Sequence, residues 1–381
     1  MPNAVMTTSG GTAAGTTSNK QAAPAVAPKT FVRSSLEHRE ASGIDKTLQI
    51  SSSDQDLGAF PIPAYGFLRS VLLLVQVSGG VGTAVFAPDA PWNILKMITI
   101  QEPNGAVISQ FNSGYDLYLA NKYGGYRAFN DPKQRADYAT STSGGGMTFL
   151  LRVPLELSGR TALGSLPNQN AAAAFQLRAT LAAATTVYST PPPTTLPTVR
   201  VTVFTEAWDQ PALSSDGSAN STTPPAMNTT QFWSKQVFPI VSGQNQIRLT
   251  RVGNYLRNLL FVYRDATGAR VSFSSNNFPS PATLFYDTRP IDSMHSIVWR
   301  NTLAERYGYT GTTDAAGGLD NGVWPYDFAH EFDGRVGYEL NEGWLPTLSS
   351  TRLELQGNFG VAGTLEVLTN DVSVAGNVFQ G

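Results

Sequence analysis

The chain contains one pattern twice, and this repeat constrains the fold more than any other feature. Residues 93–126 hold an apolar run, a turn around Pro103 to Gly105, and a helix-like segment ending in the sequence LANKYG at 119–124. Residues 256–309 hold the same three parts and end in LAERYG at 303–308. Both endings share the pattern Leu-Ala-x-(Lys/Arg)-Tyr-Gly. A repeat over such a long period indicates one β-rich domain present twice.

Length and composition agree with two domains of an all-β protein. The 381 residues suffice for two domains of about 150–200 residues, each with its own core. The sequence contains no cysteine, which excludes disulfides and thiolate zinc sites. With a net charge of −2 and 14% charged residues, it lacks the basic surface of a nucleic-acid-binding protein. No apolar run is long enough to span a bilayer, and no secretory signal is visible, so we expect the chain to be made in the cytoplasm.

Composition also suggests how the chain is divided. Residues 1–45 are predicted to form an N-terminal arm, of which residues 1–30 are built from Ala, Thr, Ser, Gly and Pro and are expected to be flexible. Within that arm, residues 31–40 are either linker or a short helix capped by Ser34 or Ser35. Residues 46–210 form the first predicted domain and 235–381 the second. The Pro- and Ser-rich residues 211–234 between them are an interdomain linker or a long surface loop.

Alternating and continuous apolar runs predict about eight strands and one inserted helix per domain. Ser113 as N-cap and Gly124 as C-cap favour a helix at 113–123. In both halves a Leu-Pro pair, at 166–167 and 345–346, precedes a strand, which is a second point of the repeat. The predicted strands are 47–51, 67–77, 92–101, 106–110, 147–157, 175–181 and 199–208, then 236–241, 246–250, 255–263, 269–274, 283–286, 351–357 and 363–370, with the second helix at 291–307.

The sequence offers weak candidates for a metal site. The histidines are His38, His295 and His330. His330 and Glu331 could bind a metal with Asp327 or Asp333, but the His-Glu-x-x-His pattern is incomplete because residue 334 is Gly. A polar loop on the rim of a sandwich explains these residues better. The glycines at 144–146 open a strand and not a helix, so they do not predict a phosphate site.

Two further groups of side chains could bind a ligand. Asp287, Arg289 and Asp292 flank Pro290 before the second predicted helix, where helix capping by Asp292 is the simpler interpretation. Aromatic side chains that gather near residue 330 could stack on sugars, although core or interface positions are commoner for such residues. These aromatic residues are Trp324, Tyr326, Phe328, Phe332 and Trp344.

The alternative to a structural protein is therefore a carbohydrate-binding or carbohydrate-cleaving tandem jelly roll. A glycosidase needs two carboxylates about 5–10 Å apart in a cleft. Glu331, Asp333, Glu339 and Glu342 could supply them, but the sequence does not bring any two together. We predict no catalytic, cofactor-binding or metal-binding residues, and no enzyme activity.

Two tandem sandwiches with a helix at the same place in each describe a double jelly roll. A strand–turn–helix pattern and a later strand pair in the first half carry a resemblance to a known family. The residues of these patterns are Asn93, Leu95, Ile98, Pro103, Asn104, Ser113, Gly114, Leu117, Asn121, Val153, Pro154, Leu155, Leu163 and 175–178. With these residues the chain resembles the major capsid proteins of the tectiviruses, tailless double-stranded DNA bacteriophages that contain a membrane.

This resemblance implies a fold and a function. The fold is two eight-stranded jelly rolls, each with a short inserted helix, behind the N-terminal arm. The function is that of a major capsid protein whose homotrimers form pseudo-hexagonal capsomers of an icosahedral virion. Its partners would be copies of itself, vertex and minor capsid proteins, and an internal membrane reached by residues 1–45. Low charge suits this role, since large contacts then form without desolvating many ions.

Overall fold

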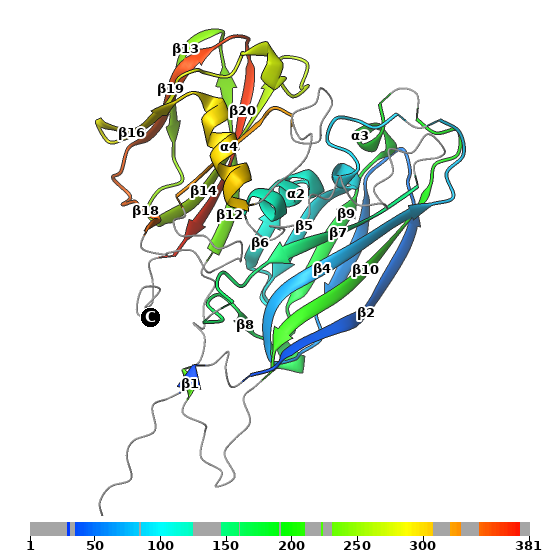
Figure 1. Ribbon diagram of the computed structural model, residues 1–381. Helices are drawn as coiled ribbons and strands as arrows, with labels where there is room; N and C mark the ends of the chain where they lie inside the picture. The colour runs from blue at the N-terminus through cyan, green and yellow to red at the C-terminus, as the bar shows by residue number, and fades with distance from the viewer. Residues whose placement is uncertain are drawn as a thin grey trace, which may run out of the picture.

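The chain forms two β-sandwiches that lie side by side in the computed structural model (Figure 1). The structure describes residues 29–30, 35–83, 85–124, 146–159, 161–189, 192–209, 222–223, 231–307, 321–328 and 343–373. Most of the predicted arm, most of the predicted linker and the C-terminal tail lie outside these residues. One short parallel pair joins β1 (Lys29–Thr30) to β11 (Thr222–Thr223).

The first sandwich is built from two antiparallel sheets. One has the strand order β2-β10-β4-β7, with β8 pairing with β4, and the other has the order β3-β9-β5-β6. The strands are β2 (Glu37–Gln49), β3 (Gln55–Pro61), β4 (Phe67–Ser78), β5 (Leu95–Gln101), β6 (Val107–Phe111), β7 (Met147–Pro154), β8 (Leu166–Pro167), β9 (Gln176–Leu181) and β10 (Thr198–Trp208). The helices are η1 (Trp92–Ile94), α2 (Gly114–Tyr123), η3 (Ala171–Ala173) and α3 (Ala184–Val187).

The second sandwich repeats this wiring strand for strand. Its sheets have the orders β12-β20-β14-β17, with β18 pairing with β14, and β13-β19-β15-β16. The strands are β12 (Gln231–Ile240), β13 (Gly243–Leu249), β14 (Tyr255–Asp265), β15 (Ala282–Tyr286), β16 (Arg289–Met294), β17 (Val323–Asp327), β18 (Leu345–Pro346), β19 (Leu353–Phe359) and β20 (Gly363–Val372). The helices are η4 (Phe273–Ser275) and α4 (Ser296–Tyr307). Two four-stranded sheets joined in this order make a jelly roll, so the predicted all-β double jelly roll is confirmed.

The repeat holds at the level of single residues. In β4, Arg69 is the extra residue of a bulge, because Leu68 pairs with Ala207 and Ser70 with Glu206. In β14, Arg257 is the extra residue at the same point, because Leu256 and Asn258 pair with adjacent residues of β20. The Leu-Pro strand lies against both sites, since β8 pairs with Phe67–Leu68 and β18 with Tyr255–Leu256. Arg69 therefore corresponds to Arg257, and the neighbouring residues follow in register.

Several sequence predictions hold. The predicted strand at 67–77 is β4, whose inward side chains are fully buried and whose outward leucines are half-buried. Ser113 caps α2 by accepting a hydrogen bond from the backbone N–H of Tyr115 at 3.0 Å, and Gly124 is the C-cap. Pro154 closes β7 at the edge of its sheet, where a missing N–H is tolerated.

Other predictions are wrong. Residues 37–40 belong to β2 and not to a helix, and the Ser35 hydroxyl bonds to the Asp209 carbonyl instead of capping. Residues 291–294 are β16, so the second helix begins only at Ser296. Residues 269–274 do not form a strand, because only a single bridge at Arg270 precedes the turn of η4. Residues 92–94 form η1, before β5 begins.

The predicted division of the chain remains a prediction, but two strands cross its boundaries. Strand β2 runs from Glu37 through the boundary at residue 45, and β12 begins at Gln231, inside the predicted linker. The sequence of β2 does not signal a strand before residue 45, because most of its residues are polar and no apolar alternation is present.

Candidate functional site

The two jelly rolls contact each other along a surface that we call the seam. It joins α2, β6 and residues 85–91 of the first jelly roll to the outward side of the β12-β20-β14-β17 sheet, here called the second outer face (Figure 1). Leu260 and Val262 of that face are 0% exposed, and they belong to the core cluster of the first jelly roll. All ten residues of α2 are buried. The first jelly roll therefore completes the packing of the second.

Local sequence explains why α2 fits into the seam. Gly114 opens the helix against the backbone of η1, where an added Cβ would collide with the Trp92 carbonyl oxygen. The ring of Tyr118 stacks on Trp92 with centroids 4.5 Å apart, which fixes the inner side of the helix. The outer side carries Asp116 toward the second jelly roll. Seven of the ten residues of α2 are glycine, alanine, leucine or tyrosine, which suits a helix that is buried on all sides.

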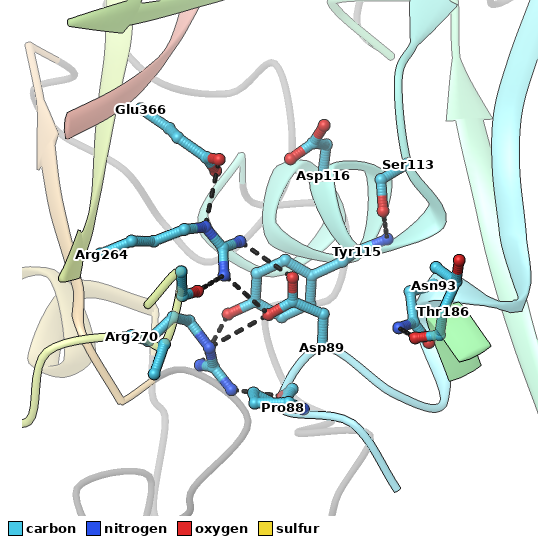
Figure 2. Close-up of polar contacts among 12 residues, drawn as sticks. Pro88, Asp89, Asn93, Ser113, Tyr115, Asp116, Thr186, Arg264, Arg270 and Glu366 are labelled. Carbon is cyan, nitrogen blue, oxygen red and sulfur yellow. Dashed lines mark hydrogen bonds and ion pairs between the residues drawn. The ribbon is translucent and has the colours of Figure 1, made fainter. Parts of the chain in front are cut away.

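Ion pairs with alternating charge cross the seam. Arg264 on β14 binds Asp89 at 2.9 Å and Glu366 on β20 at 3.1 Å (Figure 2). Lys235 on β12 binds Glu366 at 3.0 Å and Asp116 on α2 at 3.1 Å. Two cations thus link three carboxylates from both jelly rolls. The exposed fraction of the Arg264 side chain is 12%, so this pair is shielded from solvent and salt.

Arg270 ties the loop of residues 85–91 to the same cluster. Its guanidinium lies 3.2 Å from Asp89 and donates to the hydroxyl of Tyr115 at 2.8 Å and to the carbonyl of Asn321 at 2.8 Å. Figure 2 shows that Arg264 and Arg270, both of the second jelly roll, point toward the single carboxylate of Asp89 in the first. A carboxylate between two arginines holds the 85–91 loop in register with β14.

The carboxyl end of α2 meets a buried arginine. Arg257 is 0% exposed, and both terminal nitrogens donate to the carbonyl of Gly124 at 3.1 Å. The side-chain amide of Asn258 donates to the carbonyl of Tyr123 at 3.5 Å. Terminal helix carbonyls lack intrahelical partners and carry the negative end of the helix dipole, which favours a cation there. The bulge in β14 is therefore the receptor for the helix end.

Burial sets the proton affinity of Asp116. It raises the pKa of this carboxyl to about 6 although Lys235 acts in the opposite direction. Burial also opposes ionisation of Glu366, but Lys235 and Arg264 together hold the pKa of Glu366 below its usual value. Lys235 and Arg264 thus keep Glu366 ionised, whereas the carboxyl of Asp116 takes up a proton at about pH 6.

Asp116 should make the stability of the seam depend on pH. Since its folded pKa lies above the unfolded value of 3.8, the folded chain binds more protons, and this contribution to stability falls as pH rises from about 4 to about 6. We expect Asp116→Asn to match the parent at pH 4 and to become more stable than it by about 2–3 kcal/mol at pH 7.5. Urea unfolding of both proteins across this range measures the difference. A difference that does not change with pH would contradict the assignment.

The outward side of the β2-β10-β4-β7 sheet, here called the first outer face, has the same apolar pattern as the second. By the ladder registers, Leu72 and Phe204 correspond to Leu260 and Leu368, and the pair Leu74–Leu150 corresponds to Val262–Val323. The four residues of the second outer face are 0–2% exposed, whereas their counterparts on the first are only half-buried. Among the elements that the structure describes, none is drawn over the first outer face in Figure 1.

Charged side chains border this first outer face. Glu206 is 2% exposed and pairs with Arg152 at 2.6 Å and Arg39 at 2.9 Å. Arg69, at the bulge, binds Glu156 at 2.6 Å and Glu37 at 2.7 Å. Beside Arg69 the surface has a hollow of about 130 Å³. Its lining residues are Arg69, Ser70, Arg152, Pro154, Glu156, Leu157 and Gly159.

The aromatic candidates for sugar stacking are core residues where the structure describes them. Trp324 is 3% exposed and stacks on Phe278 at 4.1 Å, and Phe328 is 8% exposed. Tyr326 is half-buried and packs edge-on against Trp299 at 4.9 Å. Trp344 is 1% exposed in a small cluster with Leu157 of the first jelly roll. The interpretation of these four rings as an exposed sugar platform is wrong, and Phe332 lies outside the described residues.

The polar candidates do not form a site in the described part of the chain. Asp287 accepts a hydrogen bond from the backbone of Arg352 at 2.9 Å, whereas Asp292, on β16 with Arg289, accepts one from the Trp299 indole at 3.1 Å. The helix-capping interpretation of Asp292 is therefore wrong. No group of three His, Asp or Glu residues that could hold a metal occurs among the described residues.

The remaining candidates fall in several places. His38 lies on β2 next to Glu40, His295 immediately precedes α4, and Asp327 ends β17. Gly146 precedes β7, whereas residues 144 and 145 are not described. The other candidates lie outside the described residues: His330, Glu331, Asp333, Glu339 and Glu342. In the described helices, none is long and apolar enough to cross a membrane.

Comparisons with known proteins identify the fold. No family model matches the chain, and no curated protein matches it in sequence. The major capsid protein of STIV, the Sulfolobus Turreted Icosahedral Virus, matches with a TM-score of 0.59 at 12% identity, covering 89% of this chain and 97% of that chain. The chain has the double jelly-roll fold.

Two further double jelly-roll structures match over the same extent. The major capsid protein of Bacteriophage PM2 gives a TM-score of 0.53 at 10% identity and covers 90% of this chain and 99% of that chain. The PBCV-1 virus capsid gives 0.52 at 11% identity and covers 89% and 93%. Because nearly the whole of each structure takes part, the likeness extends to both jelly rolls and their relative placement.

Proposed function

We propose that this double jelly roll is a structural capsid protein that self-associates as a trimer, and that its trimers tile the icosahedral shell of a virion. One observation carries the proposal. The two outer faces have the same apolar register, but only the second is covered within the chain, by α2 and β6 of the first jelly roll. The first outer face therefore needs an equivalent cover, and α4 and β16 of another copy are its counterpart.

Such a contact joins different surfaces of two copies, so it is head-to-tail. Head-to-tail contacts form closed rings when the rotation between neighbours is suitable. Three copies joined this way place six jelly rolls in a ring with near-sixfold shape, because the contact between chains repeats the seam within each chain. The capsid roles of the structures with the same fold support this assembly.

The surface of α4 agrees with such a role. Every residue of α2 is buried, whereas Ile297 and Val298 at the start of α4 are 47% and 38% exposed. Met294 at the end of β16 is 49% exposed beside them. These three side chains form an apolar patch on the element that corresponds to the covering side of the seam.

In this proposal the chain catalyses no reaction, and its principal partners are other copies of itself. Contacts with vertex and minor capsid proteins, and with an internal membrane through residues 1–45, follow from the tectivirus resemblance and belong to the proposal as well.

Light scattering of the purified protein at micromolar concentration tests the trimer. The expected mass is three times the chain mass of 40.8 kDa, and it should persist on tenfold dilution. A monomer under these conditions would contradict the proposal. A mass of two chains would point to a twofold contact, which cannot be the head-to-tail arrangement.

A further inference from the structure

The seam contains a specific receptor for a helix end, and the same receptor position occurs on the first outer face. Within the chain, the bulged Arg257 and its neighbour Asn258 bind the last carbonyls of α2, those of Gly124 and Tyr123. In the corresponding bulge of β4 these positions are Arg69 and Ser70. Both positions begin with a guanidinium, which can donate hydrogen bonds to terminal carbonyls, whereas the Ser70 hydroxyl already donates to Glu206 and leaves recognition at this site to Arg69.

The surroundings of Arg69 leave room for such an acceptor. Its Nε and Nη1 are taken by Glu156 and Glu37, while Nη2 makes no hydrogen bond to the residues that the structure describes. The guanidinium also lies over the ring of Trp208, with its carbon 4.1 Å from the ring centroid, which fixes its plane. Arg69 and Ser70 both line the hollow of about 130 Å³. The group is thus held in place at the wall of an open cavity.

The helix that corresponds to α2 has the same ending. The repeated pattern Leu-Ala-x-(Lys/Arg)-Tyr-Gly places Tyr307 where α2 has Tyr123, and α4 ends at that residue. The C-terminal end of α4 therefore presents carbonyls without intrahelical partners, as α2 does.

We infer that, in the trimer, the C-terminal end of α4 of one copy docks at Arg69 and Ser70 of the next copy. The carbonyls of the helix end accept hydrogen bonds from the Arg69 guanidinium, and the positive charge complements the helix dipole. This inference rests on the proposed trimer and specifies which residues recognise the second copy. The contact within each chain and the contact between chains then have the same feature, an arginine at a strand bulge that binds a helix end.

Matched substitutions test the inference. Lysine keeps the charge of arginine but cannot donate through a rigid fork. We expect Arg69→Lys to weaken association at each contact by roughly 10- to 100-fold, as for loss of hydrogen bonds from a charged group, while the dissociated chain stays folded because lysine keeps the positive charge beside Glu156. Arg257→Lys, the same change at the corresponding position, should lower the unfolding temperature at every protein concentration. Light scattering against concentration and thermal unfolding give both readouts.

Cross-linking provides a second test that does not depend on Arg69. The sequence has no cysteine, so Gly159→Cys, in the half-buried lining of the hollow, and the exposed Glu305→Cys, two residues before the end of α4, can be introduced alone or together. A short bismaleimide should link the double variant into dimers and closed trimers and should leave both single variants unlinked. Cross-linking of either single variant would contradict the head-to-tail contact.

The outcomes separate this inference from the proposed function. A parent protein that is a monomer overturns both. A parent trimer whose Arg69→Lys variant dissociates at the same concentration, or whose double-cysteine variant is not linked, overturns the docking of α4 at Arg69 and leaves the trimer in place.

Discussion

Replacement of Arg264 by alanine is expected to lower the free energy of unfolding by about 3–5 kcal/mol, the usual cost of removing one partner from a buried ion pair. Arg264 is the central cation of the seam, with carboxylates of both jelly rolls as partners. Its removal leaves Asp89 and Glu366 facing each other across the seam with less compensating charge. Urea unfolding at pH 7 measures the loss.

A matched control is Arg200→Ala. Arg200 also pairs with an aspartate, Asp45, but both side chains are largely exposed on the first jelly roll, with exposed fractions of 54% and 40%. Exposed pairs contribute little, because water and salt screen them. The urea midpoint of this variant should stay near that of the parent. Equal losses at Arg264 and Arg200 would show that the seam network does not hold the two jelly rolls together.

The second large effect is expected on assembly. Leu74→Glu places a carboxylate at the centre of the first outer face, beside Leu150, where the proposed trimer would bury it without a partner. Burial of an unpaired charge costs at least about 3 kcal/mol, which is roughly a 100-fold loss of affinity at each contact. We expect a folded monomer at micromolar concentration. Light scattering gives the mass, and circular dichroism verifies that the strands are retained.

Val81→Glu serves as the control for this substitution. Val81 is 58% exposed and follows the end of β4, away from the centre of the first outer face. The same change in charge and size there should leave the trimer intact. If Leu74→Glu remained trimeric, the first outer face could not be the contact between copies.

Sequence patterns predicted the architecture because the relevant signals are local. Ser113 and Gly124 mark the ends of α2, and the apolar run of β4 marks a central strand. The Leu-Pro strands β8 and β18 confirmed the second point of the repeat, since each pairs with the corresponding central strand. Helix ends, apolar runs and Leu-Pro pairs each depend on residues that are close together in the sequence, so the sequence alone reveals them.

The errors in the second jelly roll arose where local signals conflict with tertiary packing. Strand β16 contains Pro290 and Asp292, which disfavour a strand, yet it lies at the edge of its sheet, where such residues are tolerated. Strand β17 carries Trp324 and Tyr326 in a Gly- and Asp-rich stretch for which the sequence predicts no strand. Pairing with β14 makes this segment a strand.

The seam network could not be found in this way, because its partners are far apart in the chain. Arg264 and Asp89 are separated by 175 positions, so no spacing rule connects them. One signal was nevertheless present. Arg257 interrupts an apolar strand in a chain with only 14% charged residues, and such a position demands a buried partner.

The asymmetry of the seam has a consequence for the order in which the protein is made. The first jelly roll leaves the ribosome first and contains the elements that cover the second outer face, so the surface that the later half needs is already folded when that half emerges. A C-terminal fragment beginning at Gln231 would lack this surface. Trp233, Leu260 and Leu368 would then be exposed as one apolar patch, which favours aggregation. Synthesis from the N-terminus thus allows the first jelly roll to cover the second outer face before that face can aggregate.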